Sequence, residues 1–216
     1  MLHKGRRAAA GSSVDLTIST GPFASTGYVD NTGASFTLTS GFQTGDLCVV
    51  GEEAYKGMGP TPSDTTPSGW TTVAMATSST SRTKVIAKSL TASDDSTSHT
   101  SISGGTATRR RWIILRPSVV IGSWTYSATS NIETTAGDPA SITASHGGNS
   151  AMDVAVAFAL GGSMSLTTAS PTPDIFVDGS GNNMGVWYLS SSTSLTWDAP
   201  DSGVRTAVSL HSFYMA

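Results

Sequence analysis

Charged residues and cysteine are both scarce in this chain of 216 residues. Only 12% of the residues are charged, the formal net charge is −3, and Cys48 is the single cysteine. A chain without a basic excess lacks the positive surface field that drives nucleic-acid binding, so no specific nucleic-acid partner is expected. One cysteine excludes an intrachain disulfide, and its place in the apolar run Leu47 to Val50 predicts a buried thiol that packs as a small hydrophobic group.

Long hydrophobic runs are missing as well. No stretch approaches the roughly 18 apolar residues that a membrane-spanning helix needs. The N-terminal residues include Lys4, Arg6 and Arg7, but no apolar segment follows them, so the sequence predicts no secretory signal peptide. We therefore expect a protein that is made in a cytoplasm and has no membrane partner.

Residue patterns that indicate catalysis or metal binding are equally scarce. Glu52 and Glu53 are adjacent, so a strand would point them to opposite faces and they could not act as a catalytic carboxylate pair. Most aspartates occur in turn contexts, where a short carboxylate accepts bonds from backbone amides. The histidines have neither the spacing nor the cysteine companions of a zinc site. The sequence thus predicts a protein that is not an enzyme, with no catalytic residue, cofactor or metal ligand.

Serine, threonine and glycine are abundant instead, and they separate short segments of alternating polarity. Serine and threonine make up about three residues in ten, and there are 23 glycines. Val14, Leu16 and Ile18 alternate with polar residues, and Phe36 and Leu38 do the same. This period of two places apolar side chains on one face of an extended segment. Both segments are therefore predicted to be half-buried strands of an all-β protein.

Three segments are continuously apolar: Leu47 to Val50, Trp112 to Leu115 and Val154 to Leu160. A strand that is covered on both faces has this composition, so these segments are predicted to be the central strands. Frequent turn residues between short strands favour two packed antiparallel sheets over a parallel sheet with crossover helices. The predicted fold is an antiparallel β-sandwich of the jelly-roll or immunoglobulin-like kind.

Two pairs of segments suggest a weak internal duplication. Residues 34–37 read Ala-Ser-Phe-Thr and residues 140–143 read Ala-Ser-Ile-Thr. The segments Asp46 to Val50 and Asp153 to Ala157 follow them in the same order. A repeat of this length is typical of two similar halves that build one sandwich, or of two packed β-modules.

We prefer a single sandwich over residues 13–216, with similar halves at about residues 33–120 and 137–216. The segment between the halves, residues 118–131, is rich in apolar and aromatic residues, whereas a linker would be polar. Residues 1–12 are polar, basic and too short to fold alone, which predicts an extended N-terminal arm.

Two turns in the first half are predicted to shape the scaffold. Gly45 permits a turn conformation, and Asp46 can accept backbone N–H bonds where the strand begins. Pro67 and Gly69 are expected to form a turn that brings Trp70 onto the core.

Four segments of the first half occur in a distinctive order. They are Gly45 to Val50, the turn Thr66 to Thr71 with its Pro-Ser-Gly-Trp-Thr sequence, the strand Thr83 to Leu90, and the apolar strand Trp112 to Leu115. This order resembles a β-sandwich family that is common among structural proteins of tailed bacteriophages. The resemblance covers about residues 33–120. Members of that family look like virion components, and the resemblance transfers no catalytic residue.

The resemblance implies a non-enzymatic virion protein. The first hypothesis is a head decoration or cement protein, a homotrimer that binds the major capsid protein and its own sister subunits. The alternative is a tail or fibre component that binds a host receptor or a carbohydrate. Its stacking residues would be exposed aromatic side chains such as Trp124, Tyr126, Trp187 or Trp197.

Two basic clusters are the candidate contact residues. The flexible arm carries Lys4, Arg6 and Arg7, which could order against an acidic neighbouring subunit. The second cluster is Arg109, Arg110 and Arg111, where strand alternation sends Arg110 to one face and its neighbours to the other. Such a run also fits a solvated strand end, and that reading stays open beside the contact role.

Overall fold

A computed structural model describes residues 16–19, 35–38, 43–55, 64–77, 81–100, 107–117, 123–133, 140–144, 152–160, 172–173, 175–177, 182–189, 193–197 and 204–215. In these ranges the chain forms fourteen strands and one short 3-10 helix, and no α-helix. Every pairing between strands is antiparallel. The predicted all-β class and the antiparallel pairing are therefore confirmed.

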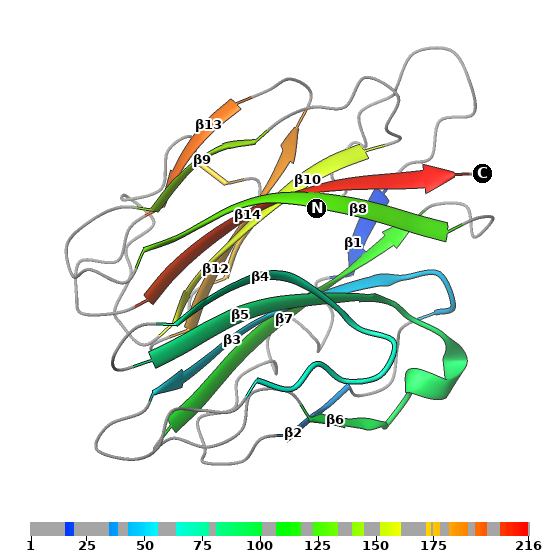
Figure 1. The fold of residues 1–216 in the computed structure, drawn as a ribbon. Coiled ribbons are helices and arrows are strands. Elements are labelled where there is room, and N and C mark those ends of the chain that lie inside the picture. The colour runs from blue at the N-terminus through cyan, green and yellow to red at the C-terminus, as the bar shows by residue number, and fades with distance from the viewer. Residues whose placement is uncertain are drawn as a thin grey trace, which may run out of the picture.

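The first half of the chain forms a five-stranded sheet with the order β1-β7-β3-β5-β4 (Figure 1). The strands are β1 (Leu16–Ser19), β7 (Ala107–Pro117), β3 (Leu47–Tyr55), β5 (Ser81–Ser89) and β4 (Thr71–Thr77).

The second half forms another five-stranded sheet, with the order β11-β12-β10-β14-β8. The strands are β11 (Ile175–Val177), β12 (Asn182–Leu189), β10 (Met152–Leu160), β14 (Val204–Met215) and β8 (Ser123–Glu133).

Each half also contains a two-stranded sheet. In the first half, β2 (Ser35–Thr37) pairs with β6 (Ser98–Thr100). In the second half, β9 (Ala140–Ala144) pairs with β13 (Thr193–Trp197). The short helix η1 (Ala92–Asp94) lies between β5 and β6.

The continuously apolar segments occupy the positions expected for them. They fall in β3, β7 and β10, and each of these strands has a neighbour on both sides. Strand alternation is equally clear in β2 and just beyond it, where Phe36 and Leu38 are buried and Thr37 is exposed. Pro117 ends β7, and the ladder between β7 and β3 already stops at Leu115. Local polarity therefore predicted these strands correctly.

The two large sheets contact each other. β3 contacts β10, β7 contacts β12, and β5 contacts β14. Figure 1 shows the large sheets one above the other, with β2-β6 and β9-β13 on opposite outer sides. The apolar layers of the described region therefore lie between sheets.

No helix within the described ranges has the length and apolar character needed to cross a membrane.

Candidate functional site

The turn before β3 begins at Gln43 and is built as its sequence predicts. Gly45 has a φ of 96°, a left-handed conformation that glycine adopts without steric cost. The N–H of Asp46 donates to the carbonyl of Gln43 at 3.1 Å, and Oδ2 of Asp46 accepts from the N–H of Gln43 at 2.8 Å. Two further backbone bonds join Gly45 and Asp46 to Leu90, at 2.9 and 2.7 Å. The predicted role of Gly45 and Asp46 at the start of the strand is confirmed.

The second turn places Trp70 on the core, as expected. Gly69 has a φ of 79°, and the N–H of Trp70 donates to the carbonyl of Pro67 at 3.1 Å. This hydrogen bond with a left-handed third residue is the geometry of a type II turn. Trp70 is buried, and its ring packs edge-on against Phe36 with the ring centroids 5.6 Å apart.

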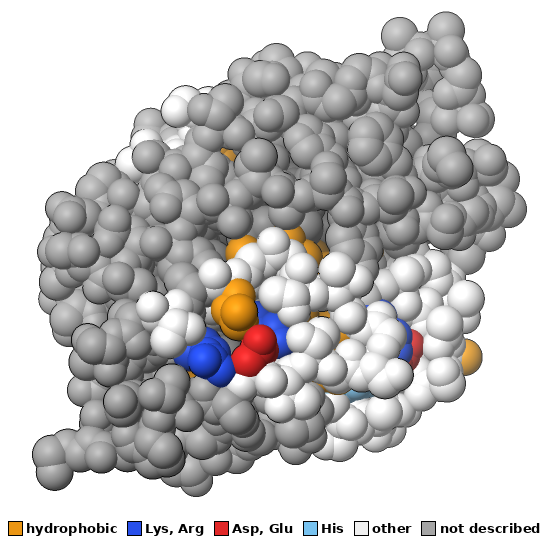
Figure 2. All heavy atoms as spheres, viewed as in Figure 1, with side chains coloured by type: hydrophobic (Ala, Val, Ile, Leu, Met, Phe, Trp, Pro, Cys, Tyr) orange, Lys and Arg blue, Asp and Glu red, His pale blue; other side chains and the backbone are white. Residues whose placement is uncertain are grey.

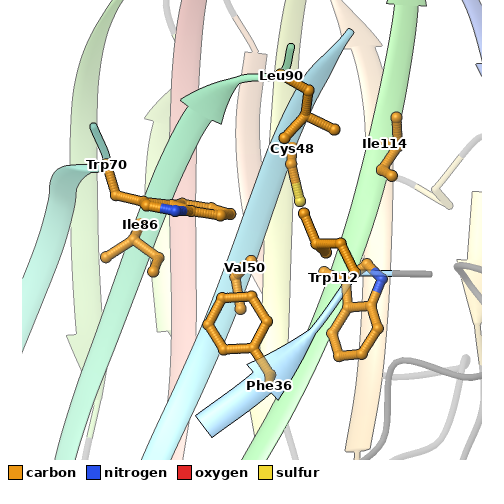
Figure 3. Packing of buried hydrophobic residues seen from close by; sticks show 9 residues of the cluster. Phe36, Cys48, Val50, Trp70, Ile86, Leu90, Trp112 and Ile114 are labelled. Atoms are coloured by element: carbon orange, nitrogen blue, oxygen red, sulfur yellow. The ribbon is translucent and has the colours of Figure 1, made fainter. Parts of the chain in front are cut away.

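A hydrophobic cluster fills the space between β2 and the first large sheet (Figure 3). Its aromatic side chains come from β2, from the turn before β4 and from β7, so the cluster joins the small sheet to the large one. Cys48 lies within it, fully buried, and burial raises the pKa of its thiol well above the ordinary value. The prediction that Cys48 packs as a small hydrophobic group is confirmed. The members are Phe36, Leu38, Cys48, Val50, Trp70, Ile86, Leu90, Trp112 and Ile114.

A polar group, the histidine cluster, adjoins this core and consists of Trp70, Lys88, Asp94 and His99. The indole N–H of Trp70 donates to Nδ1 of His99 at 3.2 Å. Nε2 of His99 lies 4.0 Å from Oδ1 of Asp94, and the ammonium of Lys88 donates to the same oxygen. Because Nδ1 accepts a bond, the neutral imidazole carries its proton on Nε2, toward Asp94.

Burial and charge shift two pKa values in the histidine cluster. Burial and the nearby Lys88 ammonium lower the pKa of His99 below 6.5, and Asp94 opposes this only in part. Burial alone would raise the pKa of Asp94, but hydrogen bonds from Lys88 and Thr91 outweigh it and lower that pKa below 3.8. The stable state at neutral pH is therefore a neutral histidine beside an ionised aspartate.

Asp94 also organises its own loop. It is the last residue of η1, and its side chain caps the N-terminal end of that helix. Oδ2 of Asp94 accepts hydrogen bonds from the backbone N–H of Thr91 at 2.9 Å and from the Thr91 hydroxyl at 3.0 Å. A side chain that caps a helix and neutralises Lys88 is fully engaged in structural contacts. The histidine cluster thus joins η1, β5 and β6 to the turn that carries Trp70.

A second polar group, the charged row, crosses three neighbouring strands of the first large sheet. Glu52 on β3 is the register partner of Lys84 on β5 and of Arg110 on β7, and all three side chains are 0% exposed. Nε of Arg110 donates to Oε1 of Glu52 at 2.8 Å. The guanidinium carbon of Arg110 also lies 5.6 Å from the centroid of the Phe36 ring. The charged row therefore borders the hydrophobic cluster.

Lys84 points to the loop before β4. Its ammonium donates to Oδ1 of Asp64 at 2.8 Å, to the carbonyl of Thr65 at 3.1 Å and to the hydroxyl of Thr66 at 2.6 Å. Three acceptors satisfy the three donors of a lysine ammonium, which is what burial of the charge demands. Its register partner on β4, Met75, is 47% exposed. Figure 2 shows basic, acidic and hydrophobic side chains of the described residues meeting on one face.

The second basic cluster does not have the surroundings expected of a contact site. Arg110 is buried in its ion pair with Glu52, and Arg111 is only 3% exposed on the opposite face of β7. Both guanidiniums are thus buried within the chain, which does not favour contact with another subunit, and the contact role of these two residues stays a prediction. Burial also differs from what the alternative interpretation, a solvated strand end, expects for Arg110 and Arg111. The contact role of Arg109, Lys4, Arg6 and Arg7 stays a prediction, because the side chain of Arg109 and the whole N-terminal arm lie outside the described residues.

Trp187 is also buried, at 3% exposure, which corrects its suggested role as an exposed stacking residue. The side chains of Trp124, Tyr126 and Trp197 lie outside the described residues.

Sequence reasoning missed the charged row, although a signal for it exists. Cys48, Val50 and Glu52 stand two residues apart in β3, so alternation places Glu52 on the face that carries the core residues Cys48 and Val50. A carboxylate on such a face needs a basic partner on a neighbouring strand. Only the register of the sheet identifies Arg110 as that partner.

Comparison with protein-family models, with curated proteins and with solved structures gives no match for this chain.

Proposed function

We propose that the chain is a non-enzymatic structural protein of a tailed-bacteriophage particle. Its fold is a β-sandwich, in which the two large antiparallel sheets pack face to face. In this proposal it lies on the surface of the particle as a head decoration or cement protein. It binds the major capsid protein and sister subunits, most simply as a homotrimer.

The contacts between the large sheets support the sandwich. A Cβ atom built on Gly51 of β3 would lie 2.5 Å from Cγ of Phe158 of β10, so the two central strands approach closely. Val49 of β3, Val156 of β10 and Val186 of the neighbouring β12 are fully buried. Two apolar sheet faces that exclude water in this way form the core of a sandwich.

The observation that carries the structural role is the use of charged side chains inside the chain. Glu52, Lys84 and Arg110 join strands to each other and to a loop, and Lys88 and Asp94 fix the loop between β5 and β6. An active site needs acid or base groups that face a bound substrate, whereas these groups face one another. Their geometry supports a rigid building block, in agreement with the resemblance to phage structural proteins.

Mass spectrometry of purified particles tests the proposal. Particles of the phage that encodes this chain should contain it in a fixed ratio to the major capsid protein. Hundreds of copies per particle would support a decoration protein, and a handful would support the tail or fibre alternative. Absence of the chain from intact particles would refute both.

Deletion of residues 1–10 tests the role of the arm. Lys4, Arg6 and Arg7 are lost together, so attachment to acidic neighbouring subunits should weaken while the sandwich remains folded. Circular dichroism checks the fold, and sedimentation with particles measures occupancy. Unchanged occupancy would reject the arm as a contact element.

A further inference from the structure

The strand order of the second half repeats that of the first. The first large sheet reads β1-β7-β3-β5-β4, and adding seven to each number gives β8-β14-β10-β12-β11, which is the order of the second large sheet. The small sheets follow the same rule, because β2-β6 becomes β9-β13. Within the described residues, each half therefore contains seven strands that are paired in the same order.

The sequence repeats at two separate places in the small sheets. Residues 34–37 and 140–143 share Ala-Ser-x-Thr, at β2 and β9. Residues 97–100 and 193–196 share Thr-Ser-x-Thr, at β6 and β13. Each match assigns a counterpart to every residue within it.

The strand register agrees with both matches at once. The first match makes Ile142 the counterpart of Phe36, and the second makes Leu195 the counterpart of His99. Phe36 pairs with His99 in the first small sheet, and Ile142 pairs with Leu195 in the second. Two unrelated strand pairings would have no reason to share this register.

We infer that the chain is a tandem pair of equivalent seven-stranded units, whose large sheets pack on each other about a pseudo-two-fold axis. The first unit begins at β1 and the second at β8, so both begin before residues 33 and 137, where the sequence repeat is first visible. The inner face of each large sheet is thus an interface, and its partner is the other unit of the same chain.

Part of the contact pattern between the large sheets fits the symmetry, whereas the contact between β4 and β8 has no reciprocal of similar extent between β11 and β1. β3 contacts its own counterpart β10, and the contact between β5 and β14 corresponds to the contact between β12 and β7. A two-fold axis turns each contact into its reciprocal and passes through the place where an element meets its own counterpart. The axis therefore passes between β3 and β10.

Gly51 and Phe158 mark the axis. They directly follow the matched segments Asp46 to Val50 and Asp153 to Ala157, so they are counterparts. They also face each other, because the Phe158 ring occupies the space that a side chain on Gly51 would need. Two equivalent large side chains could not share one place on the axis. Glycine in one unit makes room for phenylalanine from the other.

A swap of these two residues in the full chain tests the inference. Gly51→Phe adds a second ring at a filled place, and Phe158→Gly leaves a cavity, so each change alone should lower the urea midpoint of unfolding. The double substitution G51F/F158G moves the ring to the equivalent place in the other unit. Its midpoint should lie above those of both single variants.

Ala87→Phe is the matched control. Ala87 lies on β5, pairs with Val49 and faces the same layer, but it is not the counterpart of Phe158. Combination of Ala87→Phe with Phe158→Gly should therefore lower the midpoint further than either change alone. A G51F/F158G midpoint below both single variants would overturn the inference.

An experimental structure of the unaltered chain gives a second test that does not depend on these variants folding. Superposition of residues 16–117 on residues 123–215 should require a rotation close to a half-turn and should place Gly51 on Phe158. A rotation far from a half-turn, or a different residue opposite Gly51, would overturn the inference.

Discussion

Arg110→Met is the most informative single change in the first half of the chain. The substitution removes the guanidinium but keeps a long apolar side chain over Phe36, so contact with the ring is largely retained. What changes is the environment of Glu52, whose carboxylate is 0% exposed and loses the donor at 2.8 Å. Its Oε2 already has no hydrogen-bond partner in the described part of the chain.

The expected loss of stability is large for this reason. Removal of one partner from a buried ion pair costs about 3–5 kcal/mol, because the other charge stays buried without compensation. With a urea m-value of about 2 kcal/mol/M, the unfolding midpoint should fall by about 2 M. Arg82→Met is the control, since Arg82 is only half-buried and bonds to an exposed threonine. Its cost should stay within about 0.5 kcal/mol.

A double substitution separates the ion pair from simple packing. E52L/R110M removes both charges, and Lys84 keeps its own partner Asp64. Because an apolar pair can replace a buried ion pair at little cost, most of the lost stability should return. Urea unfolding followed by tryptophan fluorescence measures the three variants and the unaltered chain. A loss below about 1 kcal/mol for Arg110→Met, or no recovery in the double variant, would refute the reasoning.

Three further predictions concern the core and its turns. The Cys48 thiol should react with a thiol reagent only after unfolding, because it is fully buried and its pKa is raised. Rapid labelling of the native chain at pH 8 would contradict this prediction. Gly69→Ala should lower the free energy of unfolding by about 1–2 kcal/mol, because φ is 79° and the new Cβ would lie 3.3 Å from the Lys88 side chain. The control Ser68→Ala, at an exposed position of the same turn, should cost less than about 0.5 kcal/mol, and equal losses of stability in urea unfolding would contradict the turn assignment. The pKa of His99 in the folded state lies below its ordinary 6.5, so the unfolded state binds a proton first and the stability of the fold should decrease as the pH drops below 6.5. His99→Gln should flatten this part of the curve of stability against pH, and an unchanged slope would show that His99 is not the group responsible.

Local sequence patterns predicted the parts of the fold that depend on neighbouring residues. The apolar runs of β3, β7 and β10 identified central strands, because a strand covered on both faces has no polar side to show. Gly45 and Gly69 identified their turns, because both adopt a positive φ that other residues avoid. The turn at Gly69 also placed Trp70 on the core, since a turn of fixed geometry sets the direction of the next side chain.

The sequence by itself determined that strands form, where the main turns lie and which side chains alternate. Only the tertiary structure decided that Arg110 and Arg111 are buried, because their environment depends on a register with residues about sixty positions away in β3 and on the second large sheet. The same holds for Gly51, whose missing side chain has a reason only once Phe158 from the other half lies against it. Alternation is a property of a few consecutive residues, whereas burial of a charge or the fit of a ring depends on chain segments that only folding brings together.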